Sequence, residues 1–136
     1  MSNVEVGRAP DRDGKVRRHG PEAFAGMRKA GQLAAAALDM LTEHVKPGVT
    51  TEELDERVLA FALDNNAYPA PLNYRGFPKA ICTSINHVVC HGIPGPKPLR
   101  DGDIVNIDVT LIVDGWHGDS SRMYPVGQIP RRAERL

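Results

Sequence analysis

Two acidic side chains, Asp108 and Asp119, could bind a metal ion together if the chain brings them to one face of a β-hairpin. Residues 104–113 alternate in polarity, a pattern typical of a strand with one buried face. The apolar positions of that strand are Val105, Ile107, Val109, Leu111 and Val113. Asp108 belongs to the other set, so we expect its side chain on the polar face.

The dipeptide Asp114-Gly115 predicts how the chain turns back after that strand. Asp-Gly favours a two-residue type I′ turn, because both central residues of this turn need a positive φ. A turn centred there pairs Thr110 with Asp119 and Asp108 with Ser121. Asp108 and Asp119 are then diagonal neighbours on one face, with Cα atoms roughly 7–8 Å apart. A turn longer by one residue would send Asp119 to the opposite face, so the prediction depends on the turn.

Two carboxylates at this separation could reach a common pair of metal ions spaced about 3.5–4 Å apart. Lys and Arg are absent between Asp101 and Ser121, so no cation on these strands neutralises the two carboxylates. Like charges disfavour joint ionisation, and a bound divalent cation would relieve the repulsion. The alternative is a solvated hairpin whose aspartates are ordinary surface residues. The hairpin pattern by itself leaves both interpretations open.

Three further residues have side chains suited to chemistry. His91 could donate a hydrogen bond to a substrate or act as an acid or base, or it could be a histidine satisfied by the backbone. The neighbouring Cys90 suggests a cysteine hydrolase, but we expect a strand over residues 86–91, which would point adjacent side chains to opposite faces. Cys82 could line an apolar pocket or fill the core.

The remaining candidates lie in a proline-rich loop and near the turn. Tyr74 and Phe77 could close an apolar pocket, or they could pack on their own loop. His117 shares the polar face with Asp119. Its expected pairing opposite Ile112 puts it further from Asp108, so His117 is not included among the expected ligands.

Composition is that of an ordinary globular protein with a real core. The chain has 136 residues, 41% of them hydrophobic, and its 17 basic residues balance 17 acidic ones. This balance gives no indication of a nucleic-acid or membrane partner, and no apolar run approaches the roughly 20 residues of a membrane span. The two cysteines fit neither a zinc-ligand spacing nor a disulfide framework, so we expect a reducing, cytoplasmic location.

Periodicity predicts two helices ahead of the strands. The first, over residues 21–45, starts at a proline, and its expected apolar stripe is Phe24, Met27, Leu33, Ala34–Ala37, Leu38 and Leu41. The second, over residues 51–65, opens with a capping box of Thr50 and Glu53. Its expected buried side is Leu54, Val58, Leu59, Ala62 and Leu63. A short strand is expected over residues 79–84.

The motifs His91-Gly-Ile-Pro94 and Asn106-Ile-Asp-Val109 are similar to those of a known family. With the flanking residues of segments 73–94 and 101–119, the chain resembles methionine aminopeptidases of the bacterial type I class over about residues 19–136. The resemblance implies the α/β (α+β) pita-bread fold of creatinase-like aminopeptidases, of which this chain would be the N-terminal half, with an antiparallel sheet covered by helices. It also implies removal of the initiator methionine from new polypeptides when the next residue is small.

The same resemblance implies roles for the candidate residues. Asp108 matches the ligand of one metal, Asp119 matches the carboxylate that bridges both metals, and His91 matches a histidine that contacts the substrate near the scissile amide. The methionine side-chain pocket is implied at Tyr74, Phe77 and Cys82. Pro71 departs from the family, since some type I members carry a pocket cysteine there.

The resemblance further implies two divalent metal ions (Co, Mn, Fe, Zn or Ni) and nascent peptide N-termini as substrates. It implies a monomeric complete enzyme without nucleic-acid or membrane contacts. Complete members are longer, and their other ligands, one His and two Glu, have no counterpart here, so we expect a truncated chain that is inactive alone. Residues 1–18 are expected to form a mobile basic tail, either plainly solvated or touching an acidic surface such as the ribosome. A non-catalytic homologue that only binds peptides or ribosomes is the alternative.

Overall fold

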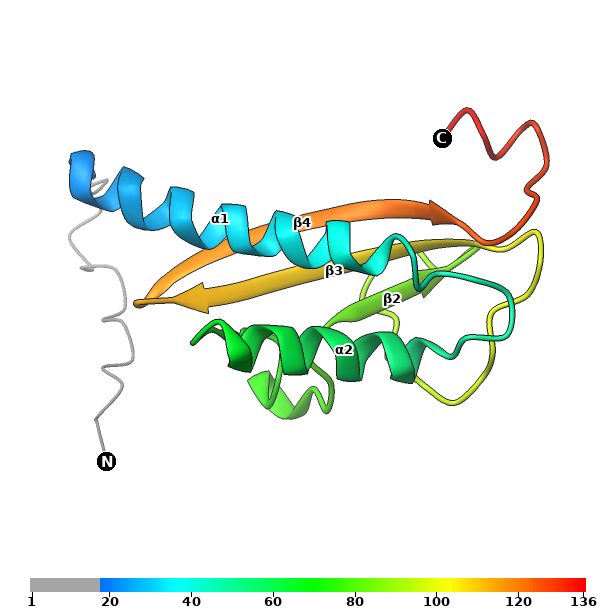
Figure 1. Ribbon diagram of the computed structural model, residues 1–136, viewed down its shortest axis with the longest axis horizontal. Helices are drawn as coiled ribbons and strands as arrows, with labels where there is room; N and C mark the ends of the chain where they lie inside the picture. Colours follow the sequence, from blue (N-terminus) through cyan, green and yellow to red (C-terminus); the bar gives the residue numbers. More distant parts are fainter. Residues whose placement is uncertain (1–17) are drawn as a thin grey trace.

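The computed structural model describes residues 18–136, which form one antiparallel sheet covered on one face by two helices (Figure 1). The expected tail over residues 1–18 lies outside the described residues except for Arg18. In chain order the elements are α1 (Pro21–Leu41), α2 (Thr51–Asp64), β1 (Tyr68–Pro69), the 3-10 turn η1 (Tyr74–Gly76), β2 (Cys82–Ile85), β3 (Ile104–Val113) and β4 (Trp116–Pro125). Within this described part, no helix has the length and apolarity needed to cross a membrane.

Strand β3 is the centre of the sheet. On one side, β3 pairs along its whole length with β4. On the other side, the first half of β3 pairs with β2 and the last residues of β3 pair with β1. The alternation expected for β3 is present, because its odd-numbered residues are buried in the core and its even-numbered residues are partly exposed. The helices cover the odd-numbered face, so the even-numbered face of β3 is left open.

Helix α1 runs along β3 and β4, but it presents smaller residues to the sheet than expected (Figure 1). The residues buried on its inner side are Ala23, Ala30, Ala34, Ala37, Leu38 and Leu41. The prediction that Phe24 and Met27 belong to the core is wrong, since they are 64% and 46% exposed. They fall on the outer side because the helix lies close to the sheet along its alanines. The helix also ends at Leu41, before the expected residue 45, and continues as turns.

Helix α2 begins at the predicted capping box. The Thr50 side chain accepts a hydrogen bond from the Glu53 amide, and the Glu53 carboxylate accepts one from the Thr50 amide. Leu54, Val58 and Ala62 are buried as expected, whereas the prediction for Leu63 is wrong because it is 57% exposed. Its position at the last turn carries it past the edge of the core.

Gly118 lets α1 approach β4 closely. A Cβ atom at Gly118 would overlap with the backbone carbonyl of Ala30, so only a glycine fits between helix and strand. Near the other end of the helix, the Tyr124 hydroxyl donates a hydrogen bond to the Leu38 carbonyl. These two contacts attach β4 to α1 on the covered face and leave Asp119, next to Gly118, on the opposite face.

We expect Gly118→Ala to lower the free energy of unfolding by about 2 kcal/mol, because the helix must move away from the strand to admit the methyl group. Urea unfolding followed by circular dichroism would measure this loss. Gly31→Ala is the matched control, since a Cβ there meets no atom within 4 Å. That substitution, in a helix interior, should stabilise by about 0.5–1 kcal/mol. Equal unfolding midpoints for Gly118→Ala and the original protein would contradict the close approach.

Candidate functional site

The β3–β4 turn has the geometry that the sequence predicts. Asp114 and Gly115 have φ values of 51° and 82°, both positive as a type I′ turn requires. The observed register pairs Thr110 with Asp119 and Asp108 with Ser121. The predicted pairing is therefore confirmed, and Asp108 and Asp119 lie on the same face as diagonal neighbours.

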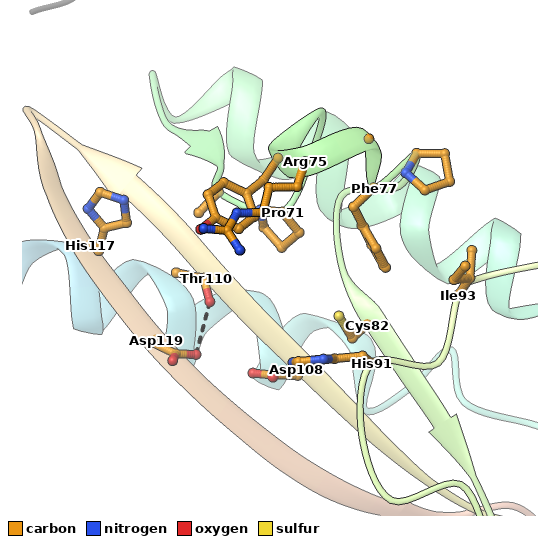
Figure 2. Close-up of a pocket in the computed structure, with 14 residues that line it drawn as sticks. Pro71, Arg75, Phe77, Cys82, His91, Ile93, Asp108, Thr110, His117 and Asp119 are labelled. Carbon is orange, nitrogen blue, oxygen red and sulfur yellow. Dashed lines mark hydrogen bonds between the residues drawn. The ribbon is translucent and has the colours of Figure 1, made fainter. Parts of the chain in front are cut away.

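Both carboxylates line an open cleft of about 920 Å³ on the uncovered face of the sheet. We call this space the cleft; its lining residues are Ala70, Pro71, Tyr74, Arg75, Gly76, Phe77, Pro78, Cys82, His91, Ile93, Asp108, Thr110, His117 and Asp119. The cleft thus contains the candidate residues named from the sequence except Cys90. Figure 2 shows the two carboxylates on adjacent strands, with Thr110 donating a hydrogen bond to Asp119 Oδ1 at 3.0 Å.

The two carboxylates oppose each other's ionisation. The pKa of Asp108 is raised above its ordinary value of 3.8, first by burial and then by the charge of Asp119. The nearby His91 acts in the opposite direction. Carboxylate oxygens are the ligands that hard divalent cations prefer, and a cation between the two groups would replace repulsion by attraction. The two carboxylates are therefore suited to be part of a divalent-metal site, and within residues 18–136 no third His, Cys, Asp or Glu completes such a group.

Strand β2 brings Cys82 directly opposite Asp108. Burial raises the pKa of the Cys82 thiol to about 11, and the negative charge of Asp108 contributes to the increase. The thiol is therefore protonated at neutral pH, so Cys82 provides a small apolar surface to the cleft.

A buried carboxylate that was not singled out from the sequence fixes the start of β2. Asp55 Oδ1 accepts hydrogen bonds from the amides of Ala80 and Ile81, at 2.8 and 3.0 Å. Burial outweighs these two bonds and raises the pKa of Asp55. Its signal in the sequence is an acidic residue beside Leu54 on the apolar side of a helix. Asp55 thus attaches α2 to the chain just before Cys82.

His91 reaches the cleft by a route that the sequence did not predict. The expected strand over residues 86–91 is wrong, because these residues form a turn and irregular chain, and His91 has a φ of 55°. The argument that separated Cys90 from His91 by strand alternation therefore does not apply, although Cys90 is exposed. Instead, the Gly92 carbonyl accepts a hydrogen bond from the Thr83 amide at 2.8 Å. This contact holds the chain around His91 and Gly92 against β2. Figure 2 shows His91 beside Asp108.

The loop between β1 and β2 supplies the remaining wall. Phe77 is partly buried and Tyr74 is 63% exposed, so Phe77 contributes more enclosed surface than Tyr74. Ile93 and Arg75 also line the cleft and were not singled out from the sequence. His117, which was set aside, pairs with Ile112 as expected and nevertheless lines the same cleft.

Comparisons with known proteins agree with this geometry. Residues 25–136 match the description of metallopeptidase family M24. A methionine aminopeptidase of Rickettsia prowazekii is 60% identical over 121 residues, which cover 89% of this chain and 47% of that protein. Its crystal structure superposes with a TM-score of 0.88 over 90% of this chain and 49% of that chain.

A more distant structure gives the same result. The crystal structure of a methionine aminopeptidase from Thermotoga maritima is 33% identical and superposes with a TM-score of 0.86, covering 90% of this chain and 49% of that chain. The chain therefore spans about half the length of the relatives it matches. The expected α/β fold of the pita-bread type, with its antiparallel sheet and covering helices, is confirmed.

We expect Asp119→Asn to lower the pKa of Asp108 in metal-free protein, because it removes the adjacent charge while burial remains. The Asp108 pKa is higher in the folded chain than in the unfolded chain, so between these two values the folded state binds more protons. The free energy of unfolding of metal-free protein should therefore fall as the pH rises through this interval, and Asp119→Asn should make the fall shallower. Carbon-13 NMR titration of the carboxyl groups measures the pKa directly.

Asp114→Asn is the control for this titration, since Asp114 is an exposed turn residue on the same hairpin and Asn-Gly also favours a type I′ turn. An Asp108 pKa that does not respond to Asp119→Asn would show that the two carboxylates do not interact.

Proposed function

Because the chain belongs to metallopeptidase family M24, we propose that the protein to which it belongs is a metal-dependent aminopeptidase. It removes the N-terminal methionine of new polypeptides when the second residue is small. The observation that carries this proposal is the pair of carboxylates, Asp108 and Asp119, on one face of the hairpin and within one cleft. The resemblance of the flanking motifs to methionine aminopeptidases specifies the substrate.

Asp108 and Asp119 would hold two divalent cations in this proposal. Co, Mn, Fe, Zn and Ni are the candidate metals. When bound, such cations polarise the scissile carbonyl and activate water for hydrolysis of the amide. Thr110, which donates to Asp119 Oδ1, orients that carboxylate and leaves its other oxygen free to act as a ligand.

His91 is the catalytic side chain that this segment contributes. It lines the cleft beside Asp108, where its imidazole can donate a hydrogen bond to the scissile amide (Figure 2). Such a bond orients the substrate and stabilises the negative charge that develops on its oxygen. The contact between Gly92 and Thr83 holds the backbone next to His91 against β2.

The methionine side chain of the substrate occupies the apolar part of the cleft. Cys82, Tyr74 and Phe77 line this part, and the protonated thiol of Cys82 is compatible with an apolar ligand. The free α-amine of the substrate lies toward the proposed metal site at Asp108 and Asp119. This arrangement accounts for an exopeptidase, because a substrate without a free amine would lose that contact.

We further propose that the substrates are nascent peptides, that the complete enzyme is a monomer and that it works in the cytoplasm, where the ribosome is an accessible partner. Two free cysteines, one of them exposed, support a reducing compartment. The expected division into a tail over residues 1–18 and a metallopeptidase segment over residues 19–136 belongs to the same proposal. The alternative of a non-catalytic peptide-binding homologue is less consistent with the presence of both carboxylates.

We expect the full-length protein, supplied with Mn²⁺ or Co²⁺, to release methionine from Met-Ala-Ser and not from Met-Leu-Ser. Asp119→Asn should lower kcat/KM for Met-Ala-Ser by more than about 100-fold, because it removes a carboxylate that binds the metals directly. Amino-acid analysis of released methionine measures the rate. Asp114→Asn makes the same chemical change at an exposed turn position and should leave kcat/KM unaltered. Full activity in Asp119→Asn would refute the proposed metal site.

The 136 residues alone should release no methionine under the same conditions. Their two carboxylates supply only part of the coordination sphere, since divalent cations in proteins are held by four or more ligands, bound waters included. Isothermal titration with Mn²⁺ would accordingly give weaker binding than in the full-length protein. Turnover by the isolated 136 residues would contradict this expectation.

A further inference from the structure

Arg75 places a positive charge at the cleft, and the proposed reaction assigns no role to this charge. It belongs to the loop between β1 and β2 and lines the same cleft as the two carboxylates. In Figure 2 it lies to the left of Phe77 and Ile93 in the view. The cation adjoins the apolar part proposed for the methionine side chain at Tyr74.

The backbone around Arg75 is held in an unusual conformation. Asn73, Arg75 and Gly76 all have positive φ values, of 66°, 48° and 83°. A left-handed conformation is uncommon for arginine and persists only where the surrounding structure imposes it. The Arg75 guanidinium also lies 5.4 Å from the centroid of the Tyr74 ring, which limits its motion through a cation–π contact.

No carboxylate among the described residues forms an ion pair with Arg75. Three other long cationic side chains form ion pairs with carboxylates: Lys29 with Asp114, Lys79 with Glu52 and Arg122 with Asp39. Within residues 18–136, the Arg75 guanidinium forms no ion pair, although Asp119 lines the same cleft. Its donors are thus available to a ligand that enters from outside.

We propose that Arg75 selects among peptide substrates by binding a carboxylate located after the scissile bond. This inference rests on the proposed aminopeptidase function. In the proposed function the α-amine and the scissile amide lie at Asp108 and Asp119, so the residues after the scissile bond extend along the cleft whose wall includes Arg75. The anions that a peptide offers there are Asp or Glu side chains and its C-terminal carboxylate, which a guanidinium binds through two parallel hydrogen bonds.

The test compares kcat/KM of the full-length enzyme for Met-Ala-Glu-Ser, Met-Ala-Gln-Ser and Met-Ala-Lys-Ser, all with amidated C-termini. An exposed ion pair predicts a preference for Glu over Gln of about three- to fivefold, expressed mainly in KM, with Lys the poorest. Raising the salt concentration to roughly 0.5 M should reduce the preference, because it screens the charges. Met-Ala-Ser with a free or amidated C-terminus shows whether the terminal carboxylate is bound as well.

Arg75→Gln should bring the ratio of Glu to Gln peptides close to one, whereas Arg75→Lys should retain part of it. Arg28→Gln is the matched control, because Arg28 is an exposed arginine on α1 outside the cleft, and it should keep the original ratio. Equal kcat/KM for the Glu and Gln peptides, or an unchanged ratio in Arg75→Gln, would overturn the proposal.

A binding measurement distinguishes this proposal from the proposed function. Fluorescence anisotropy of labelled peptides reports affinity without hydrolysis, so it decides the role of Arg75 even if no peptide is cleaved. Weaker binding of the Glu peptide to Arg75→Gln, with no change for the Gln peptide, supports the proposal. Absence of cleavage for all peptides would count against the aminopeptidase function alone.

Discussion

The two-residue turn at Asp114 and Gly115 is the constraint on which the site depends. Because side chains alternate along a strand, a change of one residue at the turn would exchange the faces of every residue on β4. The type I′ geometry removes that freedom, so Asp119 lies on the same face as Asp108. The backbone geometry of the turn at Asp114 and Gly115 therefore determines that both carboxylates lie on one face, although neither carboxylate is part of the turn.

The two faces of this hairpin have different roles. On one face the alanines of α1 and the glycine at position 118 permit a close helix–sheet contact, and the odd-numbered residues of β3 are buried beneath it. That rigid layer supports the strands from behind. The other face remains open, and β2, the loop before it and the segment around His91 surround the carboxylates there. Rigid support beneath an open polar face is what a site needs to keep charged groups at fixed positions.

The parts of the structure that could be predicted are those determined by neighbouring residues. The hairpin register and the capping box of Thr50 and Glu53 are local, and both were predicted correctly. The position of His91 depends instead on hydrogen bonds between Gly92 and β2, in which Gly92 accepts from the Thr83 amide and donates to Ser84 Oγ. The anchoring of Cys82 depends on Asp55, which is distant in sequence. Periodicity also could not show that Phe24 lies outside the core, because the inner side of α1 is set by how closely the sheet approaches.

At the proposed metal site, the repulsion between Asp108 and Asp119 would link cation uptake to folding. A metal ion that binds only the folded arrangement stabilises a protein in proportion to the logarithm of its free concentration. The melting temperature would therefore report on the metal supply, and a chelator would lower it. In a cell short of the metal, such a protein would lose conformational stability together with its catalyst, and proteases would remove the unloaded form first.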